Sequence, residues 1–417
     1  ANVTGTSNAA VGTSALALNT VNDNTAVGYN AMASNTTGRI NTAVGKSSMT
    51  ANTTGVDNAA FGGLTLDANT TGGSNTALGY ATLSGNTTAS NNTAVGSLAL
   101  YANTTGAENT AVGLSALAAN TTAASNVAVG FKTLFANTTG AQNTGLGESA
   151  LRGNTTASNN TAVGFSAGTA VTTATNNTFV GSLAGDATDD GGNNAALGYA
   201  ALSANCGDEN TAFGAYAGTA ITGASNTIVG YTAGFELAGG DNCLFLGKDS
   251  GRTGSPGGQI VNGDNEIVLG DENITEAHIQ VDWTVASDQR DKTDFTALDL
   301  GLDFVKALAP VTYRWDKRSE YGDKKAEGYD LNAQSPDGTH KEDWLDIGFK
   351  AQEVEALEIA AGYNKSSKTN LVSSCSDDGK QMGLQYSKFV PILVKAIQEQ
   401  QTLIESLTAR ITTLEGE

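Results

Sequence analysis

The sequence predicts a mainly β chain: an elongated β-solenoid or β-roll of 17-residue coils, followed by a small mixed α/β domain that ends in a coiled-coil helix. A glycine recurs every 17 residues from Gly28 to Gly198, and apolar residues and asparagines keep a constant distance from it. A fixed period of this kind is typical of stacked repeats, in which each unit contacts only its neighbours. After residue 280 the repeat ends. We therefore divide the chain into a repeat region, residues 1–280, and a C-terminal domain, residues 281–417.

The composition excludes several classes of function. The chain has 417 residues, 51 glycines, only 4 prolines and a net charge of −20. It has no basic patch for nucleic acid and no run of 18 apolar residues for membrane insertion. The three cysteines and two histidines form no ligand-type cluster, so we expect no metal site and no cofactor. The repeat is already in phase at residue 8, so we expect the chain to be a piece of a longer protein.

Each coil contains a short phrase that ends in the glycine, as in Asn-Thr-Ala-Val-Gly at residues 24–28. Because side chains alternate along a strand, we expect the large residue, such as Val27, to face the core. Ala26 would then face outward or a closely packed neighbour. A second apolar column, to which Met32 belongs, follows the glycine by four residues and is assigned to a second short strand. The glycine ends the first strand where the chain bends.

The rest of each coil is predicted to be a turn, such as Asn-Thr-Thr-Gly at residues 35–38. Aligned Asn or Thr side chains are expected to bond to the equivalent residue of the next coil. The glycine steps become 16, 16, 17 and 23 between Gly198 and Gly270, where the solenoid should end. The acidic pairs at residues 189–190 and 208–209 are interpreted as solvated turn residues, because a regular roll offers little cleft for glycosidase chemistry.

The Asn-Thr-Ala-Val-Gly phrase resembles the head repeats of trimeric autotransporter adhesins and similar repeats in phage tail fibres. The resemblance covers about 260 residues. It implies a left-handed β-roll that packs as a trimer and has an adhesive role.

Four elements of the last third carry a second resemblance. They are Ser-Asp-Gln-Arg-Asp-Lys at 287–292, Leu-Ala-Pro-Val-Thr-Tyr-Arg-Trp at 308–315, Ile-Gly-Phe-Lys-Ala-Gln-Glu-Val at 347–354, and a long terminal helix. Together they resemble the endosialidase-type intramolecular chaperone domain of phage tail spikes and fibres. That family trimerises a β-fibre during folding and then cuts the chain before the serine of its motif. The resemblance implies that Ser287 is the nucleophile, Lys292 its base, and Ala286–Ser287 the bond that is cut.

This chemistry sets conditions on the two side chains. A serine hydroxyl attacks only when its proton is removed, and a lysine accepts that proton only when burial lowers its pKa toward neutrality. A spacing of five places the two side chains on different faces of a straight helix or strand. A turn or a subunit contact is therefore required, and we expect at most a single-turnover, self-cleaving serine/lysine endopeptidase. If Ser287 only caps a turn and Lys292 is a solvated charge, there is no such activity.

The terminal helix, predicted over residues 386–415, carries an apolar seam that steps alternately by four and three residues, as in a coiled coil. The seam consists of Tyr386, Val390, Leu393, Ile397, Gln400, Ile404, Leu407, Ile411 and Leu414. It indicates oligomerisation, or alternatively packing on the chain's own core. Alternating Ile and Leu would by themselves favour two strands, so the expected trimer depends on the resemblance.

From these patterns we expect a phage tail fibre or tailspike segment that attaches to a host-surface glycan or protein receptor. It would be a homotrimer that also contacts other tail proteins. It would fold in the bacterial cytoplasm and become part of the virion tail, outside the cell. The alternatives are a bacterial trimeric surface adhesin, a polysaccharide-degrading tailspike and an ice-binding solenoid.

Overall fold

The computed structural model describes residues 5–274, 276–280, 285–323, 328–376 and 379–416. The chain forms two compact units. The first comprises Ala1–Gly251 and Val261–Gly270, and the second comprises Arg252–Ile260 and Asp271–Glu417. The predicted boundary after residue 280 adjoins residues 281–284, which lie outside the described part of the chain.

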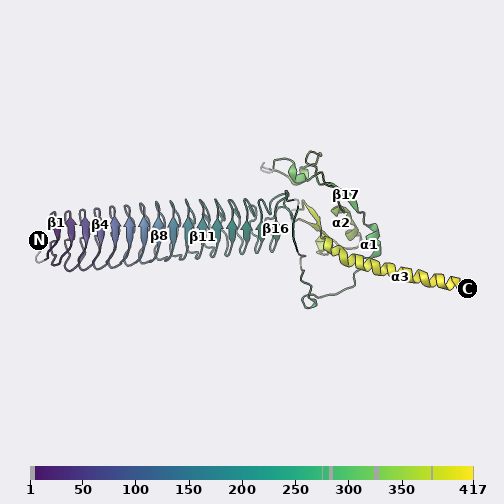
Figure 1. Cartoon of the computed structure of the whole chain (residues 1–417), viewed down its shortest axis with the longest axis horizontal. Coiled ribbons are helices and arrows are strands. Elements are labelled where there is room, and N and C mark those ends of the chain that lie inside the picture. Colours follow the sequence, from purple (N-terminus) through teal and green to yellow (C-terminus); the bar gives the residue numbers. More distant parts are fainter. Residues whose placement is uncertain (1–4, 275, 281–284, 324–327, 377–378, 417) are drawn as a thin grey trace. The chain divides into compact units, whose positions relative to one another are not determined.

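The first unit is a β-solenoid whose strands form one parallel sheet in sequence order (Figure 1). Neighbouring strands pair in register, so that Thr93 lies opposite Thr110. The predicted fold class, a mainly β solenoid of 17-residue coils, is therefore confirmed. The 16 strands are β1 Ala9–Val11, β2 Thr25–Val27, β3 Thr42–Val44, β4 Ala59–Phe61, β5 Thr76–Leu78, β6 Thr93–Val95, β7 Thr110–Val112, β8 Val127–Val129, β9 Thr144–Leu146, β10 Thr161–Val163, β11 Thr178–Val180, β12 Ala195–Leu197, β13 Thr211–Phe213, β14 Thr227–Val229, β15 Leu244–Leu246 and β16 Ile267–Leu269.

Each coil contributes one strand, so the prediction of a second short strand was wrong. The second apolar column is buried as expected, but it lies in turns. Leu83 and Leu100 have φ values of 52° and 51° there. Residues other than glycine rarely adopt this left-handed backbone conformation. In each case the backbone N–H donates to a carbonyl of the following coil, which offsets part of the strain.

The direction of the strand side chains is also opposite to the prediction. The central alanine, such as Ala94, is fully buried, whereas the large residue before the glycine, such as Val95, is partly exposed. The interior of the coil is too narrow for a large residue at the central position, because the second apolar column already occupies it. At Gly145, which takes the place of the alanine, an added Cβ would lie 2.5 Å from Thr133 Cγ2.

Three coils near the end of the solenoid exchange large and small residues inside this narrow interior. Phe179, Ile228 and Phe245 replace the central alanine and are fully buried. Glycines replace leucine in the facing column. A Cβ at Gly185 would lie 2.6 Å from the ring of Phe179, and one at Gly251 would lie 2.2 Å from that of Phe245. The interior volume is therefore shared between the two columns, as close packing requires.

Two buried asparagine ladders run along the solenoid, as the aligned turns predicted. In one, Asn52 Nδ2 donates to Asn35 Oδ1 at 2.8 Å. In the other, the backbone N–H of Asn58 donates to Asn41 Oδ1 at 3.0 Å. The first ladder stops at Asn154, where Val171 occupies the next position and Asn154 Oδ1 is left without a partner. These bonds satisfy buried polar groups and link only neighbouring coils.

The regular glycine follows from the close approach of successive coils. Gly62 has a φ of 137°, and a Cβ there would lie 2.2 Å from the carbonyl oxygen of Gly79. Both the backbone conformation and the lack of space exclude a side chain. The 17-residue glycine therefore marks a backbone contact between coils.

The second unit contains short elements around a small core. Its helices are α1 Leu302–Ala307, α2 Ala351–Ala360 and α3 Phe389–Glu415, and its strands form two antiparallel pairs, β17 Val311–Tyr313 with β18 Asp346–Gly348 and β19 Ser373–Cys375 with β20 Met382–Leu384. Five 3₁₀ turns are η1 Gln289–Asp291, η2 Arg318–Glu320, η3 Leu331–Ala333, η4 Lys365–Ser367 and η5 Tyr386–Lys388. The core contains Leu300, Phe304, Val354, Val372, Phe389 and Ile392. None of the described helices is long and apolar enough to cross a membrane.

Candidate self-cleavage site and assembly surfaces

The structure brings the two predicted site residues together. Lys292 Nζ donates to Ser287 Oγ at 2.6 Å. The turn that the spacing required is η1, which lies between the two residues. A serine nucleophile and its base must lie within hydrogen-bond reach of each other, and this pair does, with the lysine as donor here.

Two further residues of the same motif brace this turn. Asp288 is the N-cap of η1 and accepts the backbone N–H of Arg290 at 2.9 Å. It also accepts two side-chain N–H groups, from Arg290 Nε and from Arg290 Nη2 at 2.6 Å. These bonds hold the pKa of Asp288 below its usual value. The sequence prediction assigned no role to either residue, although both stand between Ser287 and Lys292.

Burial, the second requirement of the chemistry, is not met in the single chain. Ser287 and Lys292 are both exposed, as are the neighbouring residues from 285 to 297. Water therefore solvates the ammonium group, and the described residues of this chain do not provide the burial that favours a neutral amine. The single chain therefore holds the two side chains in contact at an exposed position.

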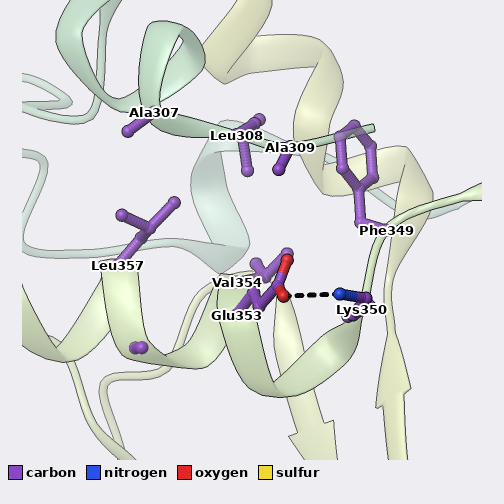
Figure 2. Close-up of a pocket in the computed structure, with 9 residues that line it drawn as sticks. Ala307, Leu308, Ala309, Phe349, Lys350, Glu353, Val354 and Leu357 are labelled. Carbon is purple, nitrogen blue, oxygen red and sulfur yellow. Dashed lines mark hydrogen bonds and ion pairs between the residues drawn. The ribbon is translucent and has the colours of Figure 1, made fainter. Parts of the chain in front are cut away.

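The motifs at residues 308–315 and 347–354 lie against each other. The motif at 308–315 supplies β17 and the motif at 347–354 supplies most of β18, with Val311 opposite Gly348 and Tyr313 opposite Asp346. The second motif continues into α2. A pocket of about 270 Å³ lies here. Figure 2 shows Ala307, Leu308 and Ala309 along one side of it, Val354 and Leu357 on the opposite side, and Phe349 beside Ala309.

A buried carboxylate fixes α2 to the strand that follows it. Glu358 is fully buried and accepts the backbone N–H groups of Leu371 at 2.8 Å, Val372 at 2.6 Å and Ser373 at 3.0 Å. Ser373 Oγ donates to the same carboxylate. Three backbone N–H groups and one hydroxyl therefore satisfy the oxygens of this buried side chain, and Glu358 fixes the backbone at the start of β19. No motif or spacing in the sequence indicates this role for Glu358.

The terminal helix α3 has two different apolar faces. Phe389, Ile392 and Ala396 are buried in the core of the unit. The predicted seam is exposed instead, with Ile397 63% and Leu414 71% accessible to solvent. Packing of the seam on the chain's own core, the alternative considered above, is therefore wrong for α3.

One seam position does contact the core. Tyr386 precedes α3, in η5, and its ring packs 5.9 Å from that of Phe389 and 6.3 Å from that of Phe349. From Gln400 to Gly416 every residue is exposed. An isolated helix of this length is marginally stable in water.

The base of α3 is tied to α1 by a charged hydrogen bond. Glu399 Oε2 accepts the backbone N–H of Leu302 at 2.7 Å, and Lys395 lies 3.2 Å from the same carboxylate. The backbone bond, and next the lysine, lower the pKa of Glu399. The exposed part of α3 therefore begins at a fixed point of the unit.

The sheet face of the solenoid carries a second exposed apolar surface. The residue before each repeat glycine points outward, and in-register pairing aligns these residues into one column. We call it the outer apolar column. Its most exposed members are Val11, Phe61, Leu78, Leu146, Leu197, Phe213, Val229, Leu246 and Leu269.

Comparison with known families finds one match, in the C-terminal unit. Residues 287–363 match the family model described as Chaperone of endosialidase (Peptidase_S74). The matched segment of this endosialidase-chaperone family begins at Ser287, contains β17, β18 and α2, and ends before α3. No curated protein and no solved structure matches the chain significantly. The match supports an intramolecular chaperone segment behind a β-solenoid, while the roles of Ser287 and Lys292 stay predictions.

The acidic pairs of the solenoid have structural partners. Asp208 accepts the backbone N–H of Gly192 at 2.7 Å, and Asp189 accepts the hydroxyl of Thr172. Among the described residues, no group of three or more His, Cys, Asp or Glu side chains could hold a metal ion.

Proposed function

We propose that this chain is an adhesive rod segment of a phage tail fibre or tailspike, and that its C-terminal domain directs trimeric folding and then cuts the chain before Ser287. The observation that carries the proposal is the match to the endosialidase-chaperone family immediately after a β-solenoid on the same chain. The host-surface glycan or protein receptor, the other tail proteins and the place in the virion tail belong to this proposal.

The physical reason for a chaperone is the uniformity of the solenoid. One coil offers nearly the same strand, the same asparagines and the same apolar residue as the next. Neighbouring coils, or neighbouring chains, can therefore pair one repeat out of register with little loss of contact. Misaligned intermediates with exposed strand edges aggregate readily. An irregular domain at one end supplies the fixed starting register that the repeats do not.

Two exposed apolar surfaces support association of several copies of this chain, and the proposed number of three comes from the family resemblance. The seam of α3 and the outer apolar column both lack cover in the single chain. A continuous apolar stripe of this length marks an interaction surface, and partner copies would meet it with their own matching stripe. Subunit contact near η1 would also supply the burial that Lys292 needs.

The proposed cut passes through an ester at Ser287. Lys292 Nζ removes the proton of Ser287 Oγ, which attacks the carbonyl carbon of Ala286 and forms an ester. The bond from that carbon to the Ser287 nitrogen breaks, and the lysine returns the proton to this nitrogen. Water then hydrolyses the ester, leaving a carboxylate at Ala286 and a free serine hydroxyl. These steps use only the side chains of Ser287 and Lys292 and one water molecule.

Deletion of residues 287–417 tests the chaperone role directly. The truncated chain should aggregate or remain monomeric, whereas full-length Ser287→Ala protein should form a trimer in analytical ultracentrifugation. Normal trimers from the truncated chain would refute the chaperone role. Failure of the trimers to adhere to any host cell or isolated host-surface glycan in a binding screen would refute the adhesive role alone.

A further inference from the structure

The second unit contains contacts between residues on opposite sides of the predicted cut. Arg252–Ile260 is a loop between two solenoid segments, yet it belongs to the second unit, as do residues 271–274. Both stretches precede Ser287 in sequence. They lie against residues that follow Ser287, around Trp315, Ser319 and Met382. We call these contacts the clasp.

The loop comes close to the residues after Ser287 at Gly254. A Cβ at this position would lie 2.9 Å from Ser319 Cβ and 3.1 Å from a carboxylate oxygen of Glu272. Gly254 has a φ of 99°, and Ser319 is only 4% exposed. The loop therefore meets η2 at a distance that only glycine allows.

A hydrogen bond from a lysine joins the two sides of the clasp. Lys317 Nζ donates to the backbone carbonyl of Glu272 at 2.8 Å and lies 3.3 Å from Glu342 Oε1. About a quarter of the Lys317 side chain is exposed, so water competes only partly for its ammonium group. A hydrogen bond from a charged donor in such a setting is among the stronger ones in proteins.

The segment that receives Lys317 is itself held in shape. Asp271 is buried and accepts the backbone N–H of Asn273 at 3.0 Å and its side-chain amide at 2.8 Å. In the loop, Ser255 is fully buried and donates to the carbonyl of Arg252 at 2.8 Å. Both pieces are preorganised, which lowers the entropy cost of holding them against the domain.

From this arrangement we infer that a cut before Ser287 does not by itself release the C-terminal domain. The clasp keeps residues 287–417 bound to the loop 252–260 and to residues 271–274 after the peptide bond is broken. Cutting and release are then separate steps, and release requires the clasp to open. This inference rests on the proposed function for its biological meaning, but the contacts are present whether or not the chain cuts itself.

The test uses an external protease, so that it does not depend on self-cleavage. A recognition sequence for a site-specific protease is inserted between residues 286 and 287 of the Ser287→Ala protein. After digestion, we expect the two fragments to elute together in size-exclusion chromatography at micromolar concentration. Separate elution would overturn the clasp, even if wild-type protein cuts itself.

Lys317→Met keeps the length of the side chain and removes its charge. We expect it to weaken the association of the cut fragments about tenfold or more. Lys306→Met is the matched control, because Lys306 pairs with Asp303 on α1 and lies outside the clasp. Equal association of all three cut proteins would show that other contacts hold the fragments and would overturn the assignment to the clasp.

Hydrogen exchange gives a second measurement that needs no variant. If the clasp persists, amides of residues 252–260 should exchange at the same rate before and after digestion. A rise in their exchange on cutting, with solenoid amides unchanged, would contradict the inference.

Discussion

Lys292 Nζ and Ser287 Oγ lie 2.6 Å apart across a single 3₁₀ turn, and both side chains face solvent. The contact is therefore built by the local chain, while the burial needed for activity must come from elsewhere. Assembly is the source that we propose. Such a dependence would prevent the domain from cutting the chain before the rod has formed.

Removal of the Ser287 hydroxyl or of the Lys292 amine should abolish the cut before Ser287. Ser287→Ala lacks the nucleophile, and Lys292→Arg keeps the positive charge but not a base that works near neutral pH. Mass spectrometry of freshly assembled protein should show fragments 1–286 and 287–417 for the wild type and the intact chain for both variants. Lys306→Arg, on the exposed side of α1, should cut normally. Unchanged cutting in Lys292→Arg would refute the lysine as base.

Asp288 should act as a positioning residue for this pair. Asp288→Asn removes the charged bonds to Arg290 that brace η1, and we expect the cut to slow about tenfold. Asp291→Asn in the same turn is the control and should change the rate less than twofold. Trimer content, measured in parallel, should be equal in both variants. A loss of trimer in Asp288→Asn would point to a folding role instead.

The exposed seam of α3 should drive association. Ile404→Asp and Leu407→Asp place charges in the apolar seam, and we expect the C-terminal domain to lose its oligomeric state in analytical ultracentrifugation. Ala409→Asp lies on the opposite face of the same helix and should leave it unchanged. If both kinds of variant associate equally, the seam is not an interface.

Two adjacent glycines give a direct test of the close approach between coils. Gly62→Ala places a Cβ 2.2 Å from the Gly79 carbonyl, and we expect a loss of about 3 kcal/mol or more in unfolding free energy. Gly63→Ala meets no atom nearer than 3.7 Å and should change stability by less than about 0.5 kcal/mol. Urea unfolding followed by circular dichroism compares them. Equal effects would exclude the backbone contact as the cause of the 17-residue glycine.

Phe179 and Gly185 share one interior volume, so substitutions at the two positions should have non-additive effects on the unfolding free energy. Phe179→Ala leaves a cavity and should cost about 3–5 kcal/mol, and Gly185→Leu should cost about 1–3 kcal/mol by overpacking. The double variant recreates the usual alanine and leucine of a coil. The decrease in its unfolding free energy should be smaller than the sum of the two single decreases, by about 1 kcal/mol or more. Strict additivity would contradict a shared interior.

The sequence predicted the solenoid because its period is exact, but it did not predict which strand face is inside. Alternation separates Ala94 from Val95 without saying which is buried. Which side chain is buried depends on the width of the interior of the coil. Leu100, in the turn that follows the strand, sets this width. The same limit applies to the site. The motif identified Ser287 and Lys292, whereas their exposure depends on neighbours that the spacing does not encode.

The asparagine ladders connect each coil only to the coil before and the coil after. Removal of residues 93–109 would join Asn92 to Thr110 and restore every ladder bond with one coil fewer. Each coil advances the rod by about 4.8 Å, the spacing of paired strands. The length of the solenoid can therefore change by whole coils of seventeen residues. Such a change does not depend on the segments at either end of the solenoid.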